Sequence, residues 1–210
     1  MTQNKPLKII GVTGISGSGT STVAEILRQQ GGFIVQADKL AHEVMKNKSS
    51  VFDETAFAQI IKSFGEKIIS ENGEINRRIL GEMVFGKDNM EKLSMLEKII
   101  HPPVVNKIFA LIEEATQTGL YKFAVIDAPL LVESGLNKEC DQCWLITAPE
   151  EVKIKRIITR DNISEEAAEK RLNSRNGDEA LKPFADKIIE NNGNLKTLEQ
   201  KIISFLEGLS

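Results

Sequence analysis

Short runs of hydrophobic residues along the chain predict the strands of a β-sheet. Four of them are nearly continuous, at Ile9–Val12, Phe33–Val35, Phe123–Ile126 and Trp144–Ile146, and a weaker fifth covers Lys187–Ile189. Continuous apolar runs of this length are typical of parallel strands that are buried on both faces. Segments with helical periodicity separate the runs, which is the pattern of βαβ units. The sequence therefore predicts an α/β fold around a five-stranded parallel sheet.

Three segments show the spacing of apolar residues that is typical of an amphipathic helix. The first, Thr22–Gln30, is followed by two glycines, where helices commonly end. The second, Val104–Ala115, follows His101-Pro102-Pro103, and we expect the helix to begin there because proline is tolerated in the first turn. The third runs from Leu195 to Leu209. Their apolar faces are expected to pack into the core.

Two segments interrupt the alternation of strands and helices. Residues 51–118 lie between the second and third predicted strands, and the highly charged residues 151–185 follow the fourth. We expect residues 51–118 to be a helical insertion that contacts a substrate. The core is then formed by residues 7–50, 120–150 and 186–210. Residues 1–210 thus make a single domain in which residues 51–118 and 151–185 extend from the core.

A glycine-rich segment after the first predicted strand carries the most specific signal in the chain. It also opens the first predicted helix, which is the context that a phosphate-binding P-loop requires. Its glycines let the backbone curl so that N–H groups point at phosphate oxygens, and the helix N-terminus adds positive partial charge. The residues expected to bind the phosphates of a nucleotide are Gly14, Gly17, Ser18, Gly19, Thr20, Ser21 and Thr22, with the Ser21 hydroxyl also placed to bind Mg²⁺.

The segment departs from the P-loop pattern G-x-x-x-x-G-K-[ST] at one position. Gly14, Gly19 and Ser21 match, but Thr20 stands where a lysine is expected. The missing ammonium would have bridged the β- and γ-phosphates, and losing one such donor costs roughly 10²–10³ in rate. The motif thus predicts phosphate binding more strongly than efficient catalysis. Two alternatives are a glycine-rich turn that binds no phosphate and a dinucleotide-binding loop, although the G-x-G-x-x-G spacing of the latter is absent.

Two carboxylates beyond predicted strands are candidate catalytic and metal-binding groups. Asp38 follows the second strand, where ligands bind in open α/β sheets, and can accept the proton of an attacking hydroxyl. Its alternative role is the N-cap of a helix over Lys39–Met45. Asp127 follows the third strand and can hold Mg²⁺ directly or through water. Its alternative role is a buried aspartate that accepts hydrogen bonds from backbone N–H groups.

Composition and charge narrow the class of protein. The chain is 41% hydrophobic and 27% charged with a net charge of -3, which fits a folded domain and lacks the basic excess of a nucleic-acid-binding protein. Residues 1–8 have no apolar signal-peptide stretch, and no run approaches the roughly 18 apolar residues of a membrane span. We therefore expect a cytoplasmic protein that binds neither nucleic acid nor membrane and is a monomer or a weak homo-oligomer.

The two cysteines, Cys140 and Cys143, form a C-x-x-C motif. One interpretation is a redox pair or half of a zinc site, and the other is two small apolar residues at a strand start. A zinc site needs about four ligands, and His42 and His101 lie far away in the sequence. A predicted strand follows the motif where a thioredoxin-like motif would open a helix, so the second interpretation is favoured.

Four segments in a specific order connect these features to a known family. They are Gly11–Ala24, Ala37–Val44, Leu96–Pro102 with the pattern L-E-x-I-x-H-P, and Asp127–Glu133 with the pattern D-x-P-L-L-x-E. From Lys8 to about Leu209 the chain resembles the dephospho-CoA kinases. These enzymes transfer the γ-phosphoryl group of ATP to the ribose 3′-hydroxyl of dephospho-CoA, the last step of coenzyme A synthesis.

The resemblance implies a three-layer P-loop kinase fold with a five-stranded parallel sheet, a helical substrate-binding insertion and a lid at residues 151–185. It implies ATP as co-substrate and Mg²⁺ bound by Ser21 and Asp127. Asp38 is expected to be the catalytic base. Arg156 and Arg160 of the lid are expected to stabilise charge on the transferred phosphoryl group.

The acceptor, dephospho-CoA, is expected to contact His101, Asp127 and Pro129. Because Thr20 replaces the lysine, an arginine or lysine from elsewhere in the chain, such as the lid, is expected to supply the missing charge. Two other functions stay open. One is a nucleotide- or CoA-binding homologue that has lost catalysis, and the other is a kinase of another small metabolite such as a nucleoside monophosphate.

Overall fold

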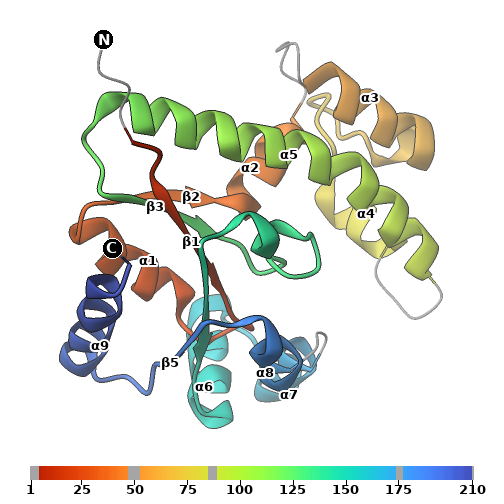
Figure 1. The fold of residues 1–210 in the computed structure, drawn as a ribbon. Coiled ribbons are helices and arrows are strands. Elements are labelled where there is room, and N and C mark those ends of the chain that lie inside the picture. Colours follow the sequence, from red (N-terminus) through yellow and green to blue (C-terminus); the bar gives the residue numbers. More distant parts are fainter. Residues whose placement is uncertain (1–4, 47–52, 85–88, 174–176, 210) are drawn as a thin grey trace. The chain divides into compact units, whose positions relative to one another are not determined.

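Five strands form one parallel sheet (Figure 1). The computed structural model describes residues 5–46, 53–84, 89–173 and 177–209. The strands are β1 Lys8–Thr13, β2 Gly32–Gln36, β3 Phe123–Asp127, β4 Gln142–Thr147 and β5 Lys187–Glu190. Their order is β2-β3-β1-β4-β5, and every neighbouring pair is parallel. The predicted five-stranded parallel sheet is therefore confirmed.

Helices connect the strands. They are α1 Thr20–Gln29, α2 Ala37–Val44, α3 Asp53–Phe64, α4 Arg77–Val84, α5 Met90–Thr118, α6 Glu150–Asp161, α7 Glu165–Leu172, α8 Asp178–Leu181 and α9 Leu195–Glu207. Short 3₁₀ helices cover Glu66–Ile68, Leu136–Glu139 and Lys182–Phe184. The helices predicted after the first strand and at the C-terminal end are confirmed as α1 and α9. Within the described ranges, no helix combines the length and the apolar character that crossing a membrane requires.

Helix α5 does not begin at its two prolines, so that prediction is wrong. Pro102 and Pro103 lie in the interior of the helix. An interior proline removes a backbone hydrogen bond and costs about 3 kcal/mol or more. Apolar residues on both sides are nevertheless buried, with Leu96 before the prolines and Val104 and Ile108 after them. We infer that burial of both halves offsets this local cost.

The chain divides into two compact units. The sheet unit comprises Met1–Gln36 and Leu111–Ser210, and the helical unit comprises Ala37–Ala110. The arrangement expected from the sequence, a single domain with an insertion at residues 51–118, stays a prediction.

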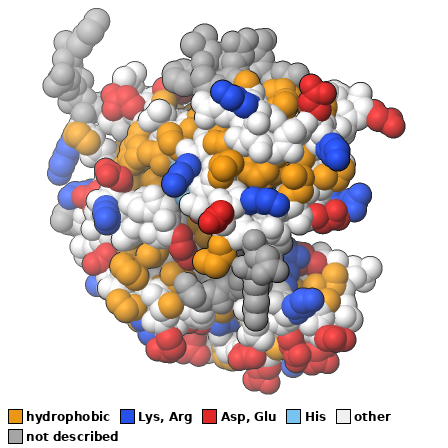
Figure 2. All heavy atoms as spheres, turned by 90° about the vertical axis from the view of Figure 1, so that its right-hand side faces the viewer, with side chains coloured by type: hydrophobic (Ala, Val, Ile, Leu, Met, Phe, Trp, Pro, Cys, Tyr) orange, Lys and Arg blue, Asp and Glu red, His pale blue; other side chains and the backbone are white. Residues whose placement is uncertain are grey.

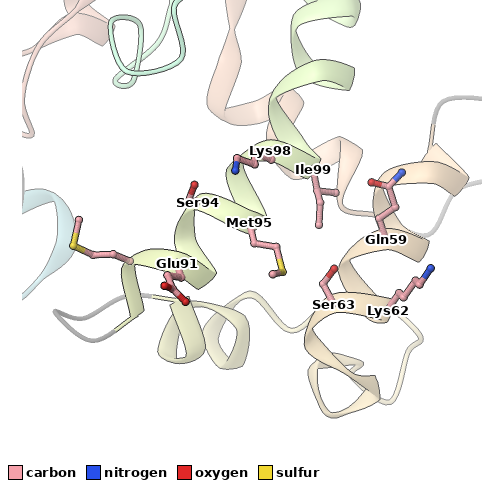
Figure 3. Close-up of a pocket in the computed structure, with 9 residues that line it drawn as sticks. Gln59, Lys62, Ser63, Glu91, Ser94, Met95, Lys98 and Ile99 are labelled. Carbon is pink, nitrogen blue, oxygen red and sulfur yellow. The ribbon is translucent and has the colours of Figure 1, made fainter.

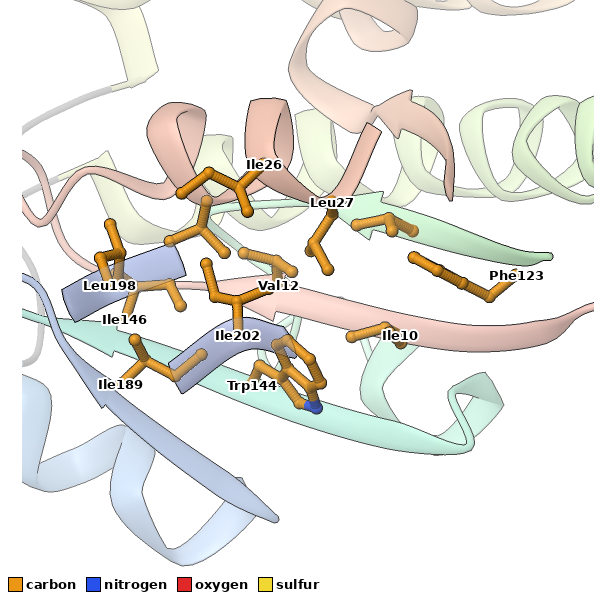
Figure 4. Packing of buried hydrophobic residues seen from close by; sticks show 12 residues of the cluster. Ile10, Val12, Ile26, Leu27, Phe123, Trp144, Ile146, Ile189, Leu198 and Ile202 are labelled. Carbon is orange, nitrogen blue, oxygen red and sulfur yellow. The ribbon is translucent and has the colours of Figure 1, made fainter. Parts of the chain in front are cut away.

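The core of the sheet unit lies between the sheet and helices α1 and α9 (Figure 4). Trp144 on β4 is fully buried, and its ring meets that of Phe205 on α9 edge-on, with 5.8 Å between centroids. The other buried members are Ile10, Val12, Val23, Ile26, Leu27, Phe123, Val125, Ile146, Ile189, Leu198 and Ile202. Because α1 is anchored through Val23, Ile26 and Leu27, its N-terminus is held at the end of β1.

The helical unit has a hydrophobic cluster of its own. Its buried members come from α3, α4, α5 and the segment between α3 and α4. They are Ile60, Phe64, Ile68, Ile75, Leu80, Val84 and Leu96. This cluster explains why the segment after the second strand folds as a compact group of helices.

Candidate active site

The loop between β1 and α1 has the backbone geometry of a phosphate cradle. Gly17 and Gly19 have φ angles of 83° and 92°, a region that L side chains rarely adopt. The Gly19 carbonyl accepts hydrogen bonds from the N–H groups of Thr22 and Val23 at 3.1 and 3.3 Å, which starts α1. Since the first N–H groups of a helix have no intrahelical acceptor, this end of α1 presents donors to an anion.

The glycines of the loop are also required by close packing. A Cβ atom at Gly14 would lie 2.5 Å from the Ile146 carbonyl oxygen, and one at Gly17 would lie 2.6 Å from the Lys153 carbonyl oxygen. The loop therefore passes between β4 and α6 with no room for side chains at these positions. The Ser18 hydroxyl is buried and has no hydrogen-bond partner within the part of the chain that the structure describes.

Two arginines of the predicted lid contact the loop. Arg156 on α6 donates from Nη1 to the carbonyl oxygens of Gly17 and Ser18 at 3.1 and 3.2 Å. Arg160, one turn later, donates from Nη2 to the Ser16 hydroxyl at 3.2 Å. Thr20, the first residue of α1, stands in the lysine position. The structure thus brings two cations to a loop that lacks its usual lysine.

Arg160 belongs to a small charged network. Its Nε and Nη2 atoms donate to the Asp161 carboxylate at 2.8 and 2.9 Å, and Arg171 on α7 donates to the same carboxylate at 2.8 Å. The hydrogen bonds from Arg160 lower the pKa of Asp161, and the same contact raises the pKa of Arg160. Both groups are therefore charged at neutral pH, and Arg160 is held beside Ser16.

The segment expected to form the lid is packed against the loop in this structure. Ile157 on α6 and Ala168 and Leu172 on α7 form a small buried cluster, and Ile15 of the loop packs against it. Residues 174–176 of the expected lid lie outside the described residues. The contact of Ile15 with α6 and α7 couples the position of the lid segment to that of the loop.

Asp127 lies at the carboxyl end of β3, beside the start of the loop. It is opposite Val12 of β1 in the sheet register and 9% exposed. The carbonyl of Pro129, two residues on, accepts a hydrogen bond from the Thr13 hydroxyl at 3.4 Å. The two predicted residues are therefore placed next to the strand that leads into the P-loop.

These residues fit a nucleotide with its magnesium ion. Mg²⁺ usually takes one or two protein ligands and fills its remaining positions with water and phosphate oxygens. The described residues contain no group of three or more His, Cys, Asp or Glu side chains that could hold a metal by themselves. The exposed Ser21 hydroxyl and the Asp127 carboxylate match the smaller ligand set that a phosphate-bound Mg²⁺ needs.

Asp38 and His101 belong to the helical unit. Asp38 is exposed and is the second residue of α2, so the alternative that it caps a helix over Lys39–Met45 is wrong. One turn later on α2, desolvation and the positive charge of Arg77 lower the pKa of His42. His101 lies within α5 and is half-buried.

The helical unit also contains a hollow that the sequence analysis did not predict. It lies between α3 and α5, as Figure 3 shows. Its volume is about 950 Å³. Its lining residues are Gln59, Lys62, Ser63, Met90, Glu91, Ser94, Met95, Lys98 and Ile99. Figure 2 shows hydrophobic side chains grouped among Lys and Arg side chains on part of one face of the molecule. None of the predicted site residues lines this hollow.

Two further groups near the loop were missed in the sequence. Lys153 on α6 is buried and forms an ion pair with Asp178 on α8. Asn191, directly after β5, is buried and hydrogen-bonded to both Ser18 and Arg156. The feature of the sequence that could have identified Asn191 as a site residue is its position just beyond a predicted strand, which is also the position of Asp127.

The C-x-x-C cysteines lie at the start of β4. Cys143 is buried on this strand opposite Gly11, and Cys140 precedes the strand. Both are free thiols. This placement agrees with the interpretation of two small residues at a strand start.

The sheet order, the glycine-rich loop between β1 and α1 and the acid at the end of the adjacent β3 define a P-loop kinase. A solved shikimate kinase from Acinetobacter baumannii shares this fold, with a TM-score of 0.50 at 17% identity over 96% of this chain and 94% of that one. A model of the dephospho-CoA kinase family matches residues 8–197. The chain belongs to the dephospho-CoA kinase family.

Individual relatives agree with this assignment. A dephospho-CoA kinase of Fusobacterium nucleatum is 41% identical over 96% of this chain and 98% of its own length. One from Dehalococcoides mccartyi is 39% identical over 92% of this chain and 93% of its own. The solved dephospho-CoA kinase of Campylobacter jejuni has a TM-score of 0.57 at 28% identity, covering 97% of each chain.

Proposed function

We propose that this protein transfers the γ-phosphoryl group of ATP to the ribose 3′-hydroxyl of dephospho-CoA. The observation that carries the proposal is the P-loop between β1 and α1, next to Asp127, in a chain of the dephospho-CoA kinase family. Membership of this family favours a kinase of dephospho-CoA over the two alternatives left open by the sequence.

In this proposal the sheet unit binds the triphosphate. The N–H groups of the loop and of the first turn of α1 donate hydrogen bonds to the phosphate oxygens. Ser21 and Asp127 hold Mg²⁺, which neutralises charge on the phosphates when bound. Arg160, kept charged by Asp161, stabilises the negative charge of the transferred group in place of the absent lysine.

On the acceptor side, Asp38 is assigned as the base, and His101, Asp127 and Pro129 are each assigned a contact with dephospho-CoA. The ribose 3′-oxygen forms a bond to the γ-phosphorus while the bond from that phosphorus to the β-γ bridging oxygen breaks. The proton of the 3′-hydroxyl passes to the Asp38 carboxylate, and ADP leaves with the bridging oxygen. This carboxylate lies exposed in the first turn of α2, where it is accessible to a hydroxyl that gives up its proton. The proposal includes a cytoplasmic location and a monomer or a weak homo-oligomer that binds neither nucleic acid nor membrane.

The test is turnover of Mg-ATP and dephospho-CoA, followed as ADP and 3′-phosphorylated product, with the natural chain beside Thr20→Lys. We expect the natural chain to turn over because Arg156 and Arg160 already bring positive charge to the loop. The added lysine is expected to raise kcat by up to about 10²-fold, the size of one preorganised donor. Activity in the variant alone would identify a chain that has lost catalysis, and silence in both would reject dephospho-CoA as the substrate.

A further inference from the structure

Asn191 is placed at the carboxyl end of the sheet by the backbone itself. Its N–H group donates to the Thr147 carbonyl at 2.7 Å, one position beyond the last β4–β5 register pair. The residue is 3% exposed. A buried amide side chain is costly unless its donor and acceptor atoms are paired. The partners of this amide therefore indicate what the residue does.

Both ends of the Asn191 amide are directed at the P-loop. Nδ2 donates to the Ser18 carbonyl at 3.0 Å, and Oδ1 accepts from Nη2 of Arg156 at 3.2 Å. Through Nη1 the same arginine donates to the carbonyls of Gly17 and Ser18. A Cβ atom at Gly19 would lie 2.2 Å from Nδ2, so this contact requires glycine there. Asn191, directly after β5, and Arg156 on α6 thus form one hydrogen-bonded clamp on two consecutive carbonyls.

The clamp determines where the N–H groups of the loop point. In a trans peptide the C=O of one residue and the N–H of the next point in opposite directions. The Gly17 and Ser18 carbonyls face the clamp, so the N–H groups of Ser18 and Gly19 face away from it. The Ser18 N–H donates within the loop, to the Ile15 carbonyl at 3.1 Å. The Gly19 N–H, beside the N-terminus of α1, therefore points away from the clamp.

We propose that Asn191, together with Arg156, is a positioning residue that holds the Gly17 and Ser18 carbonyls away from the phosphate site and the Gly19 N–H toward it. The clamp also holds the positively charged Arg156 guanidinium within hydrogen-bond distance of the loop. From there its charge attracts the negative charge of a bound triphosphate. This inference rests on the proposed function insofar as the anion is the triphosphate of ATP. It assigns a role in binding phosphate to a residue far from the P-loop in sequence.

The test compares Asn191→Asp with the matched variant Asn192→Asp. Both place the same added negative charge at the end of β5, but only the first removes the donor to the Ser18 carbonyl, because Asn192 is exposed. Titration calorimetry with Mg-ATP and with inorganic tripolyphosphate gives the dissociation constants. We expect Asn191→Asp to bind both probes about 10-fold to 100-fold more weakly than Asn192→Asp. This is the range for losing a hydrogen bond from a loop N–H to a charged phosphate oxygen.

Steady-state kinetics separate positioning from a loss of folded protein. The clamp predicts a raised KM for ATP with an unchanged KM for dephospho-CoA, whereas a smaller folded fraction lowers kcat and leaves both KM values unchanged. Arg156→Lys and Arg156→Gln provide a second comparison at a partly exposed position. Lys keeps the charge and is expected to weaken tripolyphosphate binding less than Gln does.

Equal dissociation constants for Asn191→Asp and Asn192→Asp would overturn the clamp while leaving the proposed kinase intact. A natural chain that binds tripolyphosphate but does not turn over would reject the proposed function, and the clamp would still be decided by the two tripolyphosphate titrations. A natural chain that binds neither Mg-ATP nor tripolyphosphate would overturn both.

Discussion

Gly17 offers a sharp test of the packing around the P-loop. Its φ of 83° lies in the left-handed region, and a Cβ atom there would lie 2.6 Å from the Lys153 carbonyl oxygen and 2.8 Å from the Lys153 Cα. Both atoms belong to the backbone of α6, which cannot rotate away as a side chain can. The substitution Gly17→Ala therefore adds a steric conflict to a conformational one.

The two costs can be separated with a second glycine. Gly135 has a φ of 77°, and a Cβ atom there would have no atom within 4 Å. The left-handed conformation costs an alanine roughly 1–2 kcal/mol at either position. Overpacking adds roughly 1–3 kcal/mol at Gly17 alone. The gain from a stiffer unfolded chain is the same in both variants and cancels.

The assay is urea unfolding followed by fluorescence of Trp144, the single tryptophan, which is fully buried in the sheet unit. Gly17→Ala is expected to lose roughly 1–3 kcal/mol more unfolding free energy than Gly135→Ala, because only the overpacking cost differs between them. If the loop changes its conformation to make room for the added Cβ atom while the rest of the fold is unchanged, less unfolding free energy is lost. The remaining cost of Gly17→Ala is then expected to appear as weaker binding of Mg-ATP. Equal losses in unfolding free energy and equal ATP affinities for the two variants would refute the packing argument.

Two other predictions concern the charged groups of the site. Asp127→Asn is expected to lower Mg²⁺-dependent kcat by roughly 10²-fold or more, because a carboxylate ligand is lost beside the loop, and a rate within threefold of the natural chain would contradict that role. The hydrogen bonds from Arg160 lower the pKa of Asp161 in the folded protein. The ionised Asp161 therefore stabilises the folded state at pH values above its unfolded pKa of about 4, and this contribution is lost as the pH falls through the folded pKa. Asp161→Asn should therefore lower Tm at pH 7 by more than at pH 3, and a pH-independent difference in thermal scans would contradict the assigned ion pairing.

Much of the fold and part of the site followed from local features of the sequence. All five strands were predicted because continuous apolar runs suit strands buried on both faces. The P-loop was predicted because closely spaced glycines between a strand and a helix are typical of a phosphate-binding loop. Arg156 and Arg160 were named only through the family resemblance, since nothing in their local pattern distinguishes them from other surface arginines.

Other features depend on residues that lie far apart in the sequence. Pro102 and Pro103 predicted a helix start, but α5 continues through them because residues on both sides are buried. The clamp joins Asn191 to Ser18 across 173 positions and Arg156 to Gly17 across 139. The sequence by itself determined the strands, the helical periodicities and the phosphate loop, because backbone preferences and hydrophobic periodicity act over a few residues. Only the tertiary structure decided the strand order and the partners of the loop carbonyls, because these depend on how the sheet and its helices pack.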